Sequence, residues 1–103
     1  MTVLGFEFRL KTGFFETKQV DLLISKEKLI LSPSEAEDQV ITISEKDILN
    51  ITLKNVKSLE IDIQTWDKIY QGVFDNKAEY EKLLGDLKEN INKKIVCEYE
   101  GGN

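Results

Sequence analysis

The stretch SLEIDIQTWDKIYQGVFDNKAEYEKLLGDLKENI, residues 58–91, decides the fold of this chain because its apolar spacing changes partway along it. Between residues 58 and 74 apolar and polar residues alternate, which is typical of half-buried β-strands. Apolar residues then recur at spacings of three and four, which predicts an amphipathic helix from Lys77 to about Lys93. Asn76, followed three residues later by Glu79, has the spacing of a capping box at the start of that helix.

The same alternation runs through the residues that precede this stretch. Turn-forming or charged residues separate the runs, so the chain up to Phe74 is expected to be all β. In the run 48–54 we expect Leu49, Ile51 and Leu53 to face the core. The pattern predicts seven strands, at residues 4–11, 19–25, 28–32, 40–44, 48–54, 58–64 and 68–74.

The last nine residues are assigned separately. Residues 1–94 form the expected domain, and residues 95–103 form a C-terminal tail. The tail contains Ile95, Val96 and Cys97, and it is too apolar to be inert. It is expected either to extend the helix or to add a strand to an edge of the sheet, and the sequence leaves both alternatives open.

Length and composition limit the functions that can be considered. A chain of 103 residues is one domain, and 41% hydrophobic with 32% charged residues is the composition of an ordinary folded protein. The net charge of −5 argues against nucleic acid, which is bound mainly through basic residues. The sequence shows no signal peptide, no long apolar run and a single cysteine, so a cytoplasmic location is expected.

Catalytic and metal-binding residues are not expected in this chain. There is no histidine, so the common proton shuttle and the His-activated nucleophiles are absent. Cys97 has no recognisable activating base, and one cysteine cannot provide the four ligands of structural zinc. Glu60 and Asp62 share one side of a strand, as the outer face of a sheet requires. We therefore expect no enzyme activity, no metal and no cofactor, and the sequence identifies no small-molecule substrate.

Three stretches carry a resemblance to a known family. They are VDLLISKEKLIL at 20–31, the run 41–43 that leads to Asp47 and Ile48, and the ending at 74–76 that leads into the helix. This layout resembles the pleckstrin-homology (PH) superfold, in particular the small PH-like and GRAM-like domains of bacteria. The resemblance implies a mainly β fold, a seven-stranded antiparallel PH-like barrel or sandwich capped by one C-terminal α-helix.

The resemblance also implies a binding role rather than a catalytic one. In phosphotyrosine-binding relatives of the superfold, a peptide adds to the fifth strand beside the C-terminal helix. The corresponding strand here is 48–54, and its candidate partner residues are Ile48, Asn50 and Thr52. The tail 95–99 is an alternative occupant of the same groove. We therefore expect an interaction module that binds a protein partner or a second copy of itself.

Phosphoinositide or anionic-membrane binding is the alternative function that the resemblance implies. In lipid-binding PH domains the headgroup meets basic residues at the loop end opposite the helix. The matching residues here are Arg9, Lys11, Lys18 and Lys68. Acidic residues assigned to the same end outnumber them, which disfavours a lipid ligand. These acidic residues are Glu16, Glu35, Glu37, Asp38 and Asp67.

Three aromatic residues fall in predicted connections between strands. We expect Phe14, Phe15 and Trp66 to fold over the open end of the sheet. The alternative is exposure on the surface, which favours an interaction surface, because aromatic side chains often anchor protein partners.

Overall fold

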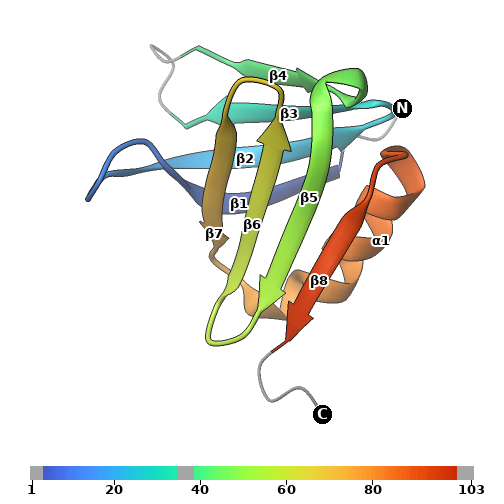
Figure 1. The fold of residues 1–103 in the computed structure, drawn as a ribbon. Helices are drawn as coiled ribbons and strands as arrows, with labels where there is room; N and C mark the ends of the chain where they lie inside the picture. The colour runs from blue at the N-terminus through green and yellow to red at the C-terminus, as the bar shows by residue number, and fades with distance from the viewer. Residues whose placement is uncertain (1–3, 35–38, 100–103) are drawn as a thin grey trace.

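The computed structural model describes residues 4–34 and 39–99. The predicted acidic residues Glu35, Glu37 and Asp38 lie outside the described residues. Within these residues, eight strands and three helical segments follow one another (Figure 1). The strands are β1 (Leu4–Lys11), β2 (Thr17–Ser25), β3 (Lys28–Pro33), β4 (Ile41–Ser44), β5 (Ile48–Asn55), β6 (Leu59–Thr65), β7 (Ile69–Phe74) and β8 (Ile95–Tyr99). The helical segments are the 3-10 turns η1 (Glu45–Asp47) and η2 (Lys77–Glu79) and the α-helix α1 (Tyr80–Asn90).

The eight strands form one bent sheet in the order β4-β3-β2-β1-β7-β6-β5-β8. Strands β1 to β4 cross β5 to β7 at a steep angle, so the two halves face each other with the core between them (Figure 1). All neighbouring strands are antiparallel except β5 and β8. The mainly β class and the single C-terminal α-helix agree with the prediction, but the strand count is eight rather than seven and the sheet is not closed.

Alternation along the strands builds the core. In β1, Phe6 and Phe8 are buried while Glu7 and Arg9 are exposed, as the period of two requires. The aromatic rings of Phe8 and Phe74 stack across the β1–β7 pair with centroids 5.1 Å apart. Helix α1 adds Tyr80, Leu83 and Leu87 to the same core, and Lys82 Nζ lies 5.1 Å from the centre of the Phe6 ring.

Strand β5 departs from simple alternation at its first residues. The register against β6 shifts between Ile48 and Asn50, which marks a β-bulge. As a result Ile48 is buried with Ile51 and Leu53, while Leu49 is only half-buried. The expectation that Leu49 faces the core was therefore wrong, because the bulge places the side chain of Ile48 in the core instead.

The helix is shorter than the spacing predicted. The segment that begins at Lys77 is first a 3-10 turn, and α1 runs only from Tyr80 to Asn90. Ile91 adopts an extended backbone, and the Asn90 carbonyl accepts the backbone N–H of Glu27 at 3.0 Å. The helix therefore ends where the carbonyl of its last residue accepts a hydrogen bond from the β2–β3 turn.

Asn76 caps the helical segment, and its removal should weaken the fold. Its Oδ1 accepts the backbone N–H of Ala78 at 3.0 Å. We expect Asn76→Ala to lower the free energy of unfolding by about 1 kcal/mol, because that N–H loses its side-chain partner. Asn76→Asp keeps an acceptor oxygen and should remain within about 0.5 kcal/mol of the wild type. Urea unfolding followed by circular dichroism measures both, and equal stability of all three proteins would contradict the capping role.

Candidate functional site

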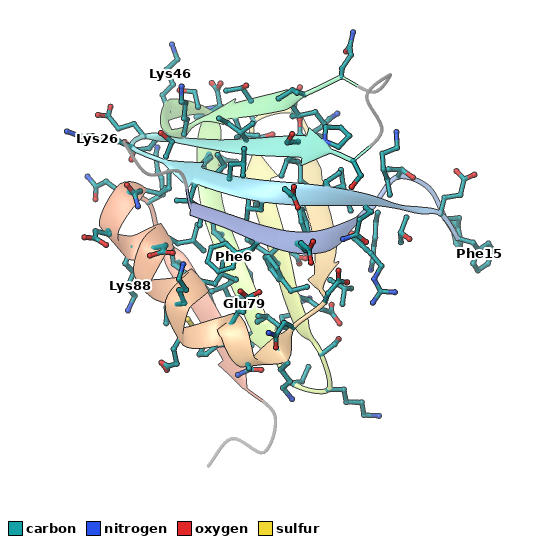
Figure 2. The ribbon with its side chains drawn as sticks, turned by 180° about the vertical axis from the view of Figure 1, so that it is seen from behind. Phe6, Phe15, Lys26, Lys46, Glu79 and Lys88 are labelled. Carbon is teal, nitrogen blue, oxygen red and sulfur yellow. The ribbon has the colours of Figure 1, made fainter. Side chains whose placement is uncertain are left out.

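The β1–β2 loop presents two exposed phenylalanines. The backbone N–H of Thr12 donates to the Glu16 carbonyl at 3.0 Å, which closes the loop at its base. Phe14 and Phe15 are 96% and 94% exposed, and their ring centroids are 5.2 Å apart. Figure 2 shows Phe15 projecting from the end of the β1–β2 hairpin, away from α1. The expectation that these rings fold over the open end was wrong, and we call this pair the Phe14–Phe15 tip.

Three other large apolar side chains among the described residues are exposed. Val40 precedes β4, Trp66 lies in the β6–β7 turn and Ile69 begins β7. Trp66 does not fold over the open end either, because its Nε1–H donates to the Lys46 carbonyl at 3.4 Å and the ring stays largely exposed. Exposed apolar side chains therefore occur at several places along the sheet, in addition to the Phe14–Phe15 tip.

The basic residues proposed for an anionic ligand occupy three different places. Arg9 and Lys11 lie on the outer face of β1, where Arg9 Nε is 3.5 Å from Asp75 Oδ1. Lys18 is half-buried and lines a cavity of about 260 Å³ with apolar neighbours that include Leu10 and Ile41. Lys68 Nζ lies 4.9 Å from the centre of the Tyr70 ring. The lipid-headgroup reading remains a prediction, and these placements do not bring the four cations to one point.

The residues proposed for a peptide groove also have partners within the chain. Ile48 is fully buried, so its side chain is not available at the mouth of a groove. Asn50 Nδ2 donates to Gln64 Oε1 at 3.4 Å. Thr52 lies between Asp62 of β6 and Val96 of β8 in the sheet register. The outer edge of β5 is therefore covered in this structure from Ile51 to Asn55.

The covering strand is the chain's own C-terminal segment. Residues 95–99 form β8, which pairs with β5 in parallel register from Ile51↔Ile95 to Asn55↔Tyr99. Of the two alternatives for the tail, the structure shows the added strand, and Ile95 packs against the core. Strand β8 consequently replaces β5 as the terminal strand of the sheet.

Within residues 4–34 and 39–99, no three His, Cys, Asp or Glu side chains are grouped closely enough to hold a metal ion. Cys97 is a free, half-buried thiol in β8. No helix among these residues is long and apolar enough to cross a membrane.

Comparison with known proteins shows that the fold is known but assigns the chain to no family. No protein-family model matches the sequence, and no curated protein matches it. Among solved structures, the Spt16D–Pob3N heterodimer contains a chain that superimposes with a TM-score of 0.74 at 14% sequence identity. The match covers 100% of this chain and 60% of that chain. A likeness at this identity shows the fold alone, and it supports a PH-like fold.

Proposed function

We propose that this domain is a non-catalytic protein-interaction module that contacts its partner through the Phe14–Phe15 tip. The observation that carries the proposal is the exposure of the two rings, 96% and 94%, at the end of a fully paired hairpin. Burying a phenylalanine side chain contributes about 2 kcal/mol, so a partner that covers both gains on the order of 4 kcal/mol. Aromatic side chains in a buried centre are the usual anchors of protein interfaces.

The geometry of the hairpin supports this role. Strands β1 and β2 pair continuously from Leu4↔Ile24 to Lys11↔Thr17, so the tip is held on two ordered arms. Preorganised contact residues lose less conformational entropy on binding. The solved structure with a similar fold is a heterodimer of two proteins, which is consistent with an interaction role. The proposal includes a second copy of this chain as a partner.

Replacing the tip should abolish partner binding while leaving the fold intact. Phe14→Ser with Phe15→Ser should change the free energy of unfolding by less than about 0.5 kcal/mol, because both rings are already in water. The same variant should lose concentration-dependent self-association in sedimentation velocity, or lose a protein retained by the wild type in a quantitative pull-down. Ile69→Ser removes another exposed apolar side chain, 54% exposed, and serves as the control that retains binding.

Vesicle flotation of the same tip variant distinguishes membrane binding from protein binding. Vesicle flotation is run with neutral lipid alone and with added phosphoinositide, using the wild type and the tip variant. If the partner is a protein, neither kind of vesicle should recover the domain. Recovery of the wild type that is lost in the tip variant would replace a protein partner with a lipid surface.

A further inference from the structure

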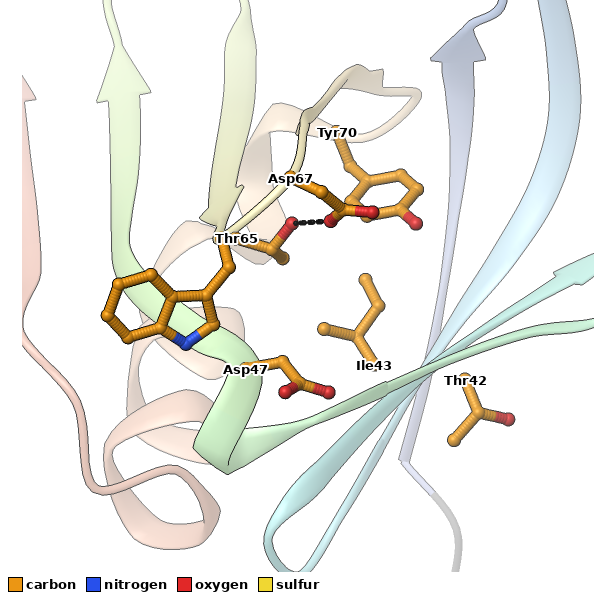
Figure 3. Close-up of a pocket in the computed structure, with 7 residues that line it drawn as sticks. Thr42, Ile43, Asp47, Thr65, Asp67 and Tyr70 are labelled. Atoms are coloured by element: carbon orange, nitrogen blue, oxygen red, sulfur yellow. Dashed lines mark hydrogen bonds between the residues drawn. The ribbon is translucent and has the colours of Figure 1, made fainter.

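A concave site lies between strand β4 and the β6–β7 turn, and it shares no residue with the Phe14–Phe15 tip. It has a volume of about 350 Å³. Its walls include Trp66 and Tyr70, two aromatic residues, and Asp47 and Asp67, two carboxylates (Figure 3). Ile43 of β4 forms part of its apolar lining. We call it the Trp66 pocket.

Hydrogen bonds within the β6–β7 turn fix one side of the Trp66 pocket. Thr65 is buried, and its Oγ1 lies 3.0 Å from Asp67 Oδ1 and 2.8 Å from the Lys68 carbonyl oxygen. The backbone N–H of Thr65 donates to the same carbonyl at 2.9 Å. Asp67 is thereby held in place through one carboxylate oxygen, which leaves the second oxygen for a ligand.

The opposite side is formed by η1 and the indole of Trp66. The Trp66 Nε1–H donates to the Lys46 carbonyl at 3.4 Å, so the ring is tied to η1. Asp47, from the same 3-10 turn, makes no hydrogen bond or ion pair with the residues that the structure describes. Its carboxylate therefore contributes an uncompensated negative charge at the pocket.

The chemistry of these walls is that of a cation site. Carboxylates attract a positive charge, and the faces of tryptophan and tyrosine rings stabilise ammonium or guanidinium groups within about 6 Å. The chain itself gives an example, because Lys68 Nζ lies 4.9 Å from the centre of the Tyr70 ring. One ammonium carries less charge than the two carboxylates, Asp47 and Asp67, that line the pocket.

We propose that the Trp66 pocket binds an arginine or lysine side chain of a partner polypeptide. Strand β4, which contributes Thr42 and Ile43 to the pocket, is a terminal strand of the sheet, so its outer edge can pair with an extended segment. A segment paired there delivers side chains next to the carboxylates. The net charge of −5 favours approach of a basic chain over an acidic one.

The single tryptophan of the chain reports directly on this site. The probe is a capped pentapeptide with a central arginine, and its control is the same peptide with citrulline, the uncharged isostere. We expect the arginine peptide to change Trp66 fluorescence saturably and the citrulline peptide to bind at least tenfold more weakly. Equal binding of the two peptides, or no change in emission with the arginine peptide, would overturn the proposal.

Variants separate the pocket from general electrostatic attraction. Asp47→Asn with Asp67→Asn should weaken arginine-peptide binding at least tenfold, and Asn at position 67 retains the acceptor for Thr65. Glu7→Gln with Glu81→Gln removes the same charge from exposed positions on β1 and α1 and should leave binding unchanged. If both double variants lost peptide binding equally, the effect would come from net charge and the proposed site would be refuted.

A gain of affinity provides the independent check. Lys68→Gln removes the ammonium that already lies over Tyr70, so the arginine peptide should bind severalfold more tightly. Weaker or unchanged binding by this variant would contradict the proposed competition. Because none of these variants alters the Phe14–Phe15 tip, the pocket and the proposed function fail or succeed separately.

Discussion

Gly72→Val should destabilise the domain by about 3 kcal/mol, a large part of the stability of a domain of this size. Gly72 lies in β7, opposite Leu10 of β1 and Ile61 of β6, so it occupies the middle of the sheet. A Cβ atom at this position would come 2.3 Å from two ring carbons of Phe8 and 2.9 Å from the Arg9 carbonyl oxygen. The Phe8 ring is buried and stacked on Phe74, so it has little room to move.

Two further variants test the cause of this effect. Gly85→Ala is the matched control, because nothing lies within 4 Å of a Cβ added there, and it should stabilise the helix by up to about 1 kcal/mol. Gly72→Ala combined with Phe8→Leu should be more stable than the sum of the single changes predicts, by about 1 kcal/mol. Chemical unfolding followed by circular dichroism measures each value. A Gly72→Ala protein as stable as the wild type would contradict the close packing.

Val96→Pro should cost about 3 kcal/mol by detaching β8 from β5. In the parallel pair the backbone N–H of Ile51 donates to the Lys94 carbonyl at 3.0 Å. Bonds in a parallel ladder alternate along the strand, so the Val96 N–H faces β5 and the Cys97 N–H faces away. Proline at position 96 leaves a β5 carbonyl without its donor. The exposed β5 edge should then promote concentration-dependent self-association.

Cys97→Pro is the control for this prediction. It places the ring on the outer side of a terminal strand, where proline is tolerated, and should cost about 1 kcal/mol or less. Thermal unfolding and sedimentation velocity at several concentrations compare the two variants. Equal destabilisation by proline at both positions would show that β8 does not pair with β5 in this register.

Local alternation was sufficient to predict most of the strands. The pattern in β6 places Leu59, Ile61 and Ile63 in the core and Glu60 and Asp62 outside, as the structure shows. The prediction succeeds because each residue of a half-buried strand faces either the core or the solvent, and its polarity indicates which. The existence and start of the helical segment followed similarly from spacing and from the Asn76 cap.

Features set by distant contacts were not visible in the sequence. The β-bulge near Ile48 arises where β5 pairs with β6 directly after η1. Ile48 and Leu49 are both apolar, so the local sequence does not show which of them is buried. The eighth strand depends on pairing between residues 95–99 and 51–55, which lie far apart along the chain. The apolar character of the tail was the one sign that it had a structural role.

The candidate surfaces were only partly predictable for the same reason. The sequence placed Phe14 and Phe15 in a loop, but exposure depends on whether the loop reaches back over the sheet. The Trp66 pocket joins Asp47 from η1 with Asp67 and Tyr70 from the β6–β7 region, and no motif connects these positions. A composition rich in acidic residues gave no indication of which carboxylates would face aromatic rings.

Photo-crosslinking from the Phe14–Phe15 tip tests the central claim most directly. Phe15→p-benzoylphenylalanine keeps an aromatic side chain at the exposed position, and the same residue in place of Glu81, exposed on α1, is the control. In cells that make the protein naturally, irradiation should join the residue-15 variant to a defined protein chain, a partner or a second copy. The residue-81 variant should not form that product. The account is contradicted if position 15 gives no protein adduct beyond those formed from position 81.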